Sequence, residues 1–121
     1  AGCNVAFFSA DEKNGRELAQ KSGARFYPAS FSGGIFDDIA KAWGGLDGLV
    51  VTDGKIPETA NVEELKRLIV VDKNPKLPSV ENSDGLTVNG VNISGRSASD
   101  VAHLCLMLCL NASDCINRRI I

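Results

Sequence analysis

The sequence has little net charge and no long apolar run. Thirteen lysines and arginines are interspersed with fifteen aspartates and glutamates among 121 residues, which gives a formal charge of -2. A surface without a basic patch offers little that nucleic acid or an anionic membrane would bind. No segment approaches the roughly 20 apolar residues that span a bilayer, and none has the pattern of a secretory leader. We therefore expect a cytoplasmic protein that binds neither nucleic acid nor membrane.

Metal-ligating residues are also scarce. The chain holds one histidine and four cysteines, and no two cysteines are separated by two residues. A zinc site needs more ligands at closer spacing, so we expect no metal site and no disulfide framework. Cys105 and Cys109 stand four apart in an apolar helical run, which predicts that they share one face and pack as small hydrophobes.

Apolar residues make up 44% of the chain, enough for one domain with a real core. The first half alternates short apolar runs with segments of helical periodicity. Such alternation predicts right-handed βαβ units and a mainly parallel sheet. The expected elements are a strand at Val5–Phe8, a helix from the cap Asp11 to Ser22 with Leu18 and Ala19 facing the sheet, a strand at Arg25–Tyr27, a helix at Ile35–Trp43 and a strand at Leu46–Val51.

The second half is less regular. A helix can begin at Thr59 or Asn61, and Leu68–Val71 either ends that helix or forms a strand, because periodicity does not separate the two. The proline-rich residues 72–85 read as a surface loop. Next we expect a strand at Leu86–Ile93 that is interrupted at Gly90. A helix capped by Ser97–Asp100 follows, and because it is apolar almost all round from Val101 to Leu110, we expect it to be buried on more than one side. The last expected element is a strand at Cys115–Ile121.

The run from Trp43 to Gly54 resembles the middle of a short-chain dehydrogenase/reductase, where a strand of pattern W-G-x-L-D-x-L-V ends in N-N-A-G. The ending here reads Val51-Thr52-Asp53-Gly54. The resemblance implies a shortened Rossmann-like three-layer α/β fold with a mainly parallel sheet, in one truncated domain over residues 1–121. Further segments resemble that family in the same order, namely Ala1–Ala6, Glu17–Ala19, Arg25–Ser30, Val88–Gly95, Asp100–Ala102 and Leu108–Ile121.

The functional motifs of that family are absent from this sequence. A dinucleotide site needs a glycine-rich turn between the first strand and its helix, and the sequence begins after the place of that turn. Gly33-Gly34 and Gly44-Gly45 fit helix boundaries instead. The family's catalytic tyrosine has a lysine four residues later, whereas Tyr27 is followed at that distance by Phe31. We therefore expect no nucleotide cofactor.

Isolated titratable residues have structural interpretations. His103 is alone in an apolar helix, and Asp37 and Asp38 are adjacent, so on a helix they point about 100° apart and form no acid/base pair. Both aspartates fit the first turn of a helix, where negative charge is favourable. Arg118 and Arg119 fit a solvated edge.

These observations favour a non-dehydrogenase binding or assembly module, in which self-association as a homo-oligomer covers the exposed sheet edge left by the missing first strand. The alternative is a divergent oxidoreductase or small-substrate enzyme whose site is completed across subunits. A third interpretation is a fragment or splice form of a longer enzyme. Because ligands bind beyond the carboxyl ends of parallel strands, a small-molecule ligand would meet Ser9, Asp11, Ser30, Thr52, Asp53 and Ser94.

Overall fold

The computed structural model describes residues 4–28, 34–52, 65–79, 85–109 and 116–121. The chain divides into two compact units, Ala1–Asp38 and Ile39–Ile121, with the boundary inside a helix. Each unit has its own parallel sheet. The helix start expected at Thr59 or Asn61 lies outside the described residues, and the single domain over residues 1–121 stays a prediction.

The first unit contains one βαβ motif. Strand β1 (Ala6–Ser9) leads into helix α1 (Glu12–Ser22), and strand β2 (Arg25–Pro28) pairs with β1 in parallel, Ala6 opposite Arg25. Asp11 caps α1 by accepting a hydrogen bond from the Asn14 amide at 3.2 Å. Gly23 ends the helix with a left-handed φ of 74°, as its sequence predicts.

Helix α1 approaches the sheet through a glycine. Gly15 is buried, and a Cβ at this position would collide with the ring of Phe26 on β2. The Phe26 ring also packs against Phe7 on β1, with the centroids 5.3 Å apart. The expectation for Leu18 is wrong, because its side chain is 53% exposed while Ala19 is half-buried. A face of small residues brings the helix close to the strands and turns Leu18 outward.

Helix α2 (Ile35–Trp43) has the predicted bounds. Asp37 and Asp38 lie in its first turn and Lys41 in its last, the arrangement that a helix dipole favours. Gly44 follows with a φ of 80° and donates its amide to the Ala40 carbonyl at 2.8 Å. The double glycine therefore ends the helix, as expected.

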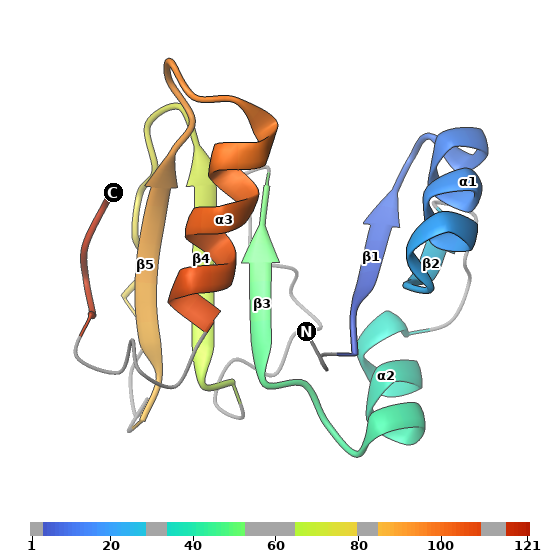
Figure 1. The fold of residues 1–121 in the computed structure, drawn as a ribbon. Coiled ribbons are helices and arrows are strands. Elements are labelled where there is room, and N and C mark those ends of the chain that lie inside the picture. The colour runs from blue at the N-terminus through green and yellow to red at the C-terminus, as the bar shows by residue number, and fades with distance from the viewer. Residues whose placement is uncertain (1–3, 29–33, 53–64, 80–84, 110–115) are drawn as a thin grey trace. The chain divides into compact units, whose positions relative to one another are not determined.

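The second unit is built on three parallel strands in the order β3-β4-β5, comprising β3 (Gly48–Val51), β4 (Arg67–Asp72) and β5 (Thr87–Asn92) (Figure 1). The register places Gly48 opposite Arg67, and Arg67 opposite Thr87. Leu68–Val71 is therefore a strand, which settles the alternative that periodicity left open. Strand β4 is central and buried on both faces, as a continuous apolar run in a parallel sheet should be.

Strand β5 runs without a break through Gly90, so the expected interruption is wrong. A Cβ at Gly90 would lie 2.9 Å from the Pro75 Cβ and 3.2 Å from Ile120 Cγ1. The glycine lets the proline-rich segment cross closely over the strand. Part of the predicted surface loop is consequently core, because Pro75 is buried and Leu77 packs against one face of the sheet.

Helix α3 (Ala98–Cys109) covers the other face, crossing β4 and β5 (Figure 1). The Ser97 hydroxyl accepts a hydrogen bond from the Asp100 amide at 3.1 Å, which confirms the predicted cap. Leu108 is buried against Ile69, Val71 and Val91. The expectation of burial on more than one side is wrong, because Leu106 is 45% and Met107 39% exposed. Cys105 is half-buried as predicted, whereas Cys109 is exposed.

Residues 116–121 follow the outer edge of β5. Only Ile120, in an isolated parallel bridge to Gly90, has strand geometry in the described part of the predicted Cys115–Ile121 strand. The three described helices and two all-parallel sheets make a small Rossmann-like α/β fold and confirm the predicted class. None of the described helices is long and apolar enough to cross a membrane.

Candidate functional site

The structure brings two predicted ligand-binding residues together at the carboxyl end of β1. The Ser9 hydroxyl accepts a hydrogen bond from the Asp11 amide at 3.1 Å. Both Asp11 carboxylate oxygens bond Asn14, Oδ1 to its amide and Oδ2 to its side-chain nitrogen at 2.6 Å. These bonds fix the turn into α1, so Asp11 acts here as a helix cap.

Thr52 and Ser94 lie at the carboxyl edge of the three-stranded sheet but on its two outer strands. Thr52 directly follows β3, Ser94 comes two residues after β5, and both are exposed. With β4 between them and strands spaced about 4.8 Å apart, the two residues are separated sideways by roughly 10 Å. They share an edge without converging on one point. Ser30 and Asp53 lie outside the described residues.

Polar groups at this edge are engaged with nearby backbone. Asp72, which ends β4, accepts a hydrogen bond from the Lys73 amide at 2.7 Å, and Asn92 accepts one from the Ser94 amide at 2.9 Å. Such bonds hold strand-to-loop turns in shape. No group of three or more histidine, cysteine or acidic side chains in the described part of the chain is placed to hold a metal ion.

A three-residue polar cluster in the first unit was not predicted. Tyr27 is only 2% exposed, and its hydroxyl donates to Asp38 Oδ2 at 2.5 Å. Arg25 Nη2 donates to the same oxygen at 2.8 Å, and its guanidinium stands 5.8 Å from the centre of the Tyr27 ring. The aspartate thus joins α2 to two side chains on one face of β2.

The electrostatics of this cluster are those of a structural contact. Burial, and after it the hydrogen bond to Asp38, raises the pKa of Tyr27 above its usual value. The Asp38 charge raises the pKa of Arg25. A tyrosine that acts as a base needs a lowered pKa, so the shift at Tyr27 is opposite to the one that such chemistry uses. The only sequence signal was the period of two that puts Arg25 and Tyr27 on one strand face.

The described part of the second unit has three further buried polar residues, Arg67, Thr87 and Asn89. Arg67 begins β4, and its guanidinium donates to the Lys66 carbonyl at 3.2 Å. Arg67 is therefore at the amino edge of the sheet, opposite the predicted ligand-binding edge. Asn89 in β5 is 2% exposed. Its side-chain nitrogen donates to the Ile116 carbonyl, and its side-chain oxygen accepts a hydrogen bond from the Arg119 amide.

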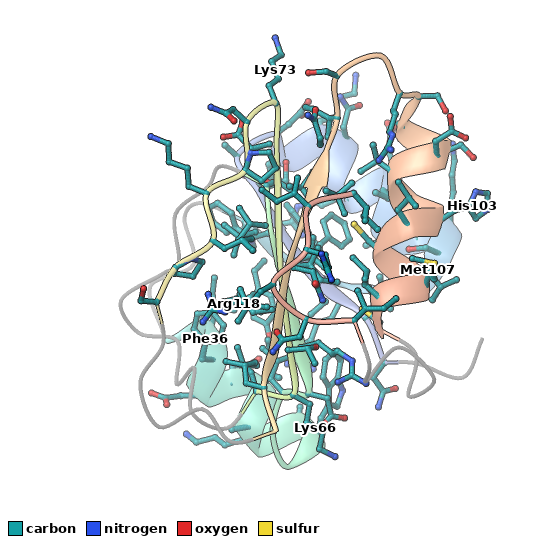
Figure 2. All side chains as sticks on the ribbon, turned by 90° about the vertical axis from the view of Figure 1, so that its left-hand side faces the viewer. Phe36, Lys66, Lys73, His103, Met107 and Arg118 are labelled. Carbon is teal, nitrogen blue, oxygen red and sulfur yellow. The ribbon has the colours of Figure 1, made fainter. Side chains whose placement is uncertain are left out.

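In the described part of the second unit, two of the four exposed large apolar residues, Leu106 and Met107, lie on α3. His103 and Met107 project from α3 on the side away from the sheet (Figure 2). The sequence from Val101 to Cys109 carries no lysine, arginine, aspartate or glutamate. Cys105 lies on the inner side of this helix, where burial, and to a smaller degree the neighbouring Cys109, raises the pKa of its thiol.

Comparison with known proteins found no matching family model, no matching curated protein and no matching solved structure. The resemblance to short-chain dehydrogenases/reductases therefore stays a prediction.

Proposed function

We propose that this chain is a binding or assembly module that works as a homo-oligomer, on a scaffold derived from the short-chain dehydrogenase/reductase framework but without dehydrogenase activity. The outer surface of α3 is the observation that carries the proposal. Leu106 and Met107 are the large exposed apolar side chains there. Burying them gains about 25 cal/mol for each Å² of apolar surface removed from water.

The charge pattern of α3 favours a second copy as the partner. In a two-fold interface both copies contribute the same surface, so a charge near the axis faces its own copy. His103 is the one ionisable side chain other than cysteine between Val101 and Cys109. Interfaces between identical subunits are more apolar than ordinary protein surface and poor in charged residues at their centre. The α3 surface has this composition.

The edge strand β3 adds to the argument. In the described structure β3 pairs with β4 alone, and Val50 on β3 is 41% exposed. Val50 is in register with Ile69, which packs in the cluster beneath α3, so Val50 lies on the α3 side of the sheet. A strand edge with apolar neighbours readily pairs with another chain. Burial of this side of the unit would cover Val50 and the α3 surface together.

Sedimentation velocity over a micromolar concentration series tests the proposal. The wild-type chain is expected to form dimers or larger assemblies. Leu106→Glu places a charge in the interface and should raise the dissociation constant at least about tenfold, since an unpaired buried charge costs more than 1.4 kcal/mol.

Leu18→Glu is the matched control. It makes the same chemical change at a comparably exposed leucine on α1, outside the proposed interface, and should leave the assembly unchanged. A wild-type chain that stays monomeric throughout the series contradicts the proposal. Equal weakening by both substitutions contradicts the assignment of the interface to α3.

A further inference from the structure

The segment Ile116–Ile121 lies along the outer edge of β5 and is joined to it by backbone hydrogen bonds, with one parallel bridge between Gly90 and Ile120. The amides of Gly90 and Asn92 donate to the carbonyls of Arg119 and Ile121, each at 2.8 Å. In return the amides of Arg118 and Ile121 donate to Val88 and Gly90, at 2.8 and 2.9 Å. Backbone pairing of this kind is the way in which sheets take up extended peptides.

Two asparagines fix the register of the segment, one from each side of the contact. Asn89 on β5 donates its side-chain nitrogen to the Ile116 carbonyl at 3.0 Å and accepts the Arg119 amide on its oxygen at 3.1 Å. Asn117 accepts the Val88 amide on its side-chain oxygen at 2.9 Å. Because Asn89 is buried, loss of the segment would leave its amide group without these partners.

Hydrogen bonds hold this segment more than apolar burial does. Ile116 and Ile121 are half-buried against the cluster under α3, whereas Arg118, Arg119 and Ile120 are exposed. The Arg118 guanidinium donates to the carbonyl of Pro78, a further contact to backbone. All of these contacts involve only the segment and the surface that receives it. An identical segment from another chain would reproduce each of them, the condition under which copies exchange elements at little cost.

We propose that the edge of β5 is a strand-binding site which, in the assembled protein, receives the segment Ile116–Ile121 of a second copy. The inference rests on the proposed self-association. The segment packs against the cluster beneath α3, the helix that carries the proposed interface. The seven residue steps from Cys109 to Ile116 reach at most about 25 Å, so the segment of a copy bound through α3 starts near that interface.

Disulfide trapping between two full-length chains tests the exchange. One chain carries Val88→Cys and the other Arg118→Cys, at positions joined by the Arg118 amide and the Val88 carbonyl. The chains are co-expressed with different tags and oxidised, and the bond between positions 88 and 118 is identified by mass spectrometry of the linked peptides. Because the new thiols are on different chains, this bond requires the segment of one copy to lie on β5 of the other.

The expected yield is at least about tenfold above that of a control pair, Val88→Cys with Leu18→Cys, since bound thiols have a far higher effective concentration than colliding ones. Val88 is buried, so a second pair, Val91→Cys with Ile121→Cys, serves if the first fails to fold, because both of these side chains pack in the cluster under α3. Trapping at the control level in a protein that sediments as an oligomer overturns the exchange and leaves the proposed function intact. A single chain that carries both new cysteines is the last comparison. If the protein sediments as a monomer and only this chain forms the bond, within itself, the exchange and the proposed function are both overturned.

Discussion

Asp37 and Asp38 are chemically identical neighbours with different surroundings. Both lie in the first turn of α2, but Asp38 accepts hydrogen bonds from Tyr27 and Arg25. The sequence gives them one shared interpretation, favourable charge at a helix start. Which of the two acquires partners depends on how α2 meets β2, and sequence spacing does not contain that contact.

Substitution of the two aspartates separates the helix contribution from the contact. Asp38→Asn should lower the free energy of unfolding by about 1 to 2 kcal/mol, because it weakens a charge-assisted hydrogen bond to a buried phenol. Asp37→Asn loses the same position in the helix dipole and should cost about 0.5 kcal/mol or less. Urea unfolding followed by circular dichroism measures both. Equal losses would mean that the cluster contributes nothing to stability.

The burial of Tyr27 predicts that the free energy of unfolding falls at alkaline pH. Its pKa in the folded chain is raised, first by burial and then by the Asp38 hydrogen bond. The unfolded phenol titrates near pH 10, so the contribution to stability is complete below about pH 10 and is lost as the pH rises through the folded pKa.

Tyr27 is the only tyrosine of the chain, so tyrosinate absorbance reports this group directly. The unfolding free energy of the wild type should fall relative to that of Tyr27→Phe over the same alkaline range. A tyrosinate transition at or below the usual pKa would contradict the buried environment.

At the scale of elements, the segment that packs against a strand decides whether a glycine in that strand can be replaced by alanine. Gly48 begins β3 and Gly90 lies within β5, and each has an ordinary strand conformation. Their surroundings differ. A Cβ at Gly48 would meet the Arg67 Cβ at 3.5 Å, an ordinary contact, whereas one at Gly90 would meet Pro75 at 2.9 Å and Ile120 at 3.2 Å.

Alanine at these two glycines should therefore act in opposite directions. Gly90→Ala is expected to lower the free energy of unfolding by about 1 to 3 kcal/mol, because the proline-rich segment or Ile120 must shift. Gly48→Ala should be neutral or stabilising by up to about 1 kcal/mol, since it reduces the freedom of the unfolded chain. Thermal unfolding of the two variants measures this. A destabilised Gly48→Ala would show that the two strands are equally crowded.

At the scale of the whole molecule, the question is whether the chain still binds a dinucleotide. The predicted ligand-binding residues that the structure describes sit on two separate sheets, and several of the nearby polar groups bond local backbone. None of this supplies the glycine turn at a helix start that a pyrophosphate needs. The alternative of an oxidoreductase completed across subunits makes the opposite prediction.

Calorimetric titration with NADH and NADPH distinguishes the two. We expect no saturable heat at micromolar cofactor, with the mass of the protein recorded by light scattering in the same buffer. Saturable micromolar binding would contradict the assembly module and favour a cofactor site formed between copies. Leu106→Glu is the useful comparison in that case, because a site shared between subunits should disappear together with the oligomer.

The sequence alone determined the features that depend on neighbours within a few residues. The bounds of α2, the cap Asp11, the stop at Gly23 and the cap Ser97 were all predicted, because each rests on a hydrogen bond or a φ angle within one helical turn. The alternation of strand and helix likewise predicted parallel pairing, since a crossover helix returns the chain in the same direction.

Only the tertiary structure decided the features whose partners are distant in sequence. The run Leu68–Val71 forms a strand because it pairs with β3 on one side and β5 on the other. Gly90 lies within β5 rather than at a break, because Pro75 packs too closely against the strand for a Cβ there. Asn89 is buried with its amide bonded to the backbone of Ile116 and Arg119, a contact between residues 27 and 30 positions apart that sequence spacing does not contain. Leu106 and Met107 stay outside because α3 turns a single face to the sheet, which an almost uniformly apolar helix does not specify by its own pattern.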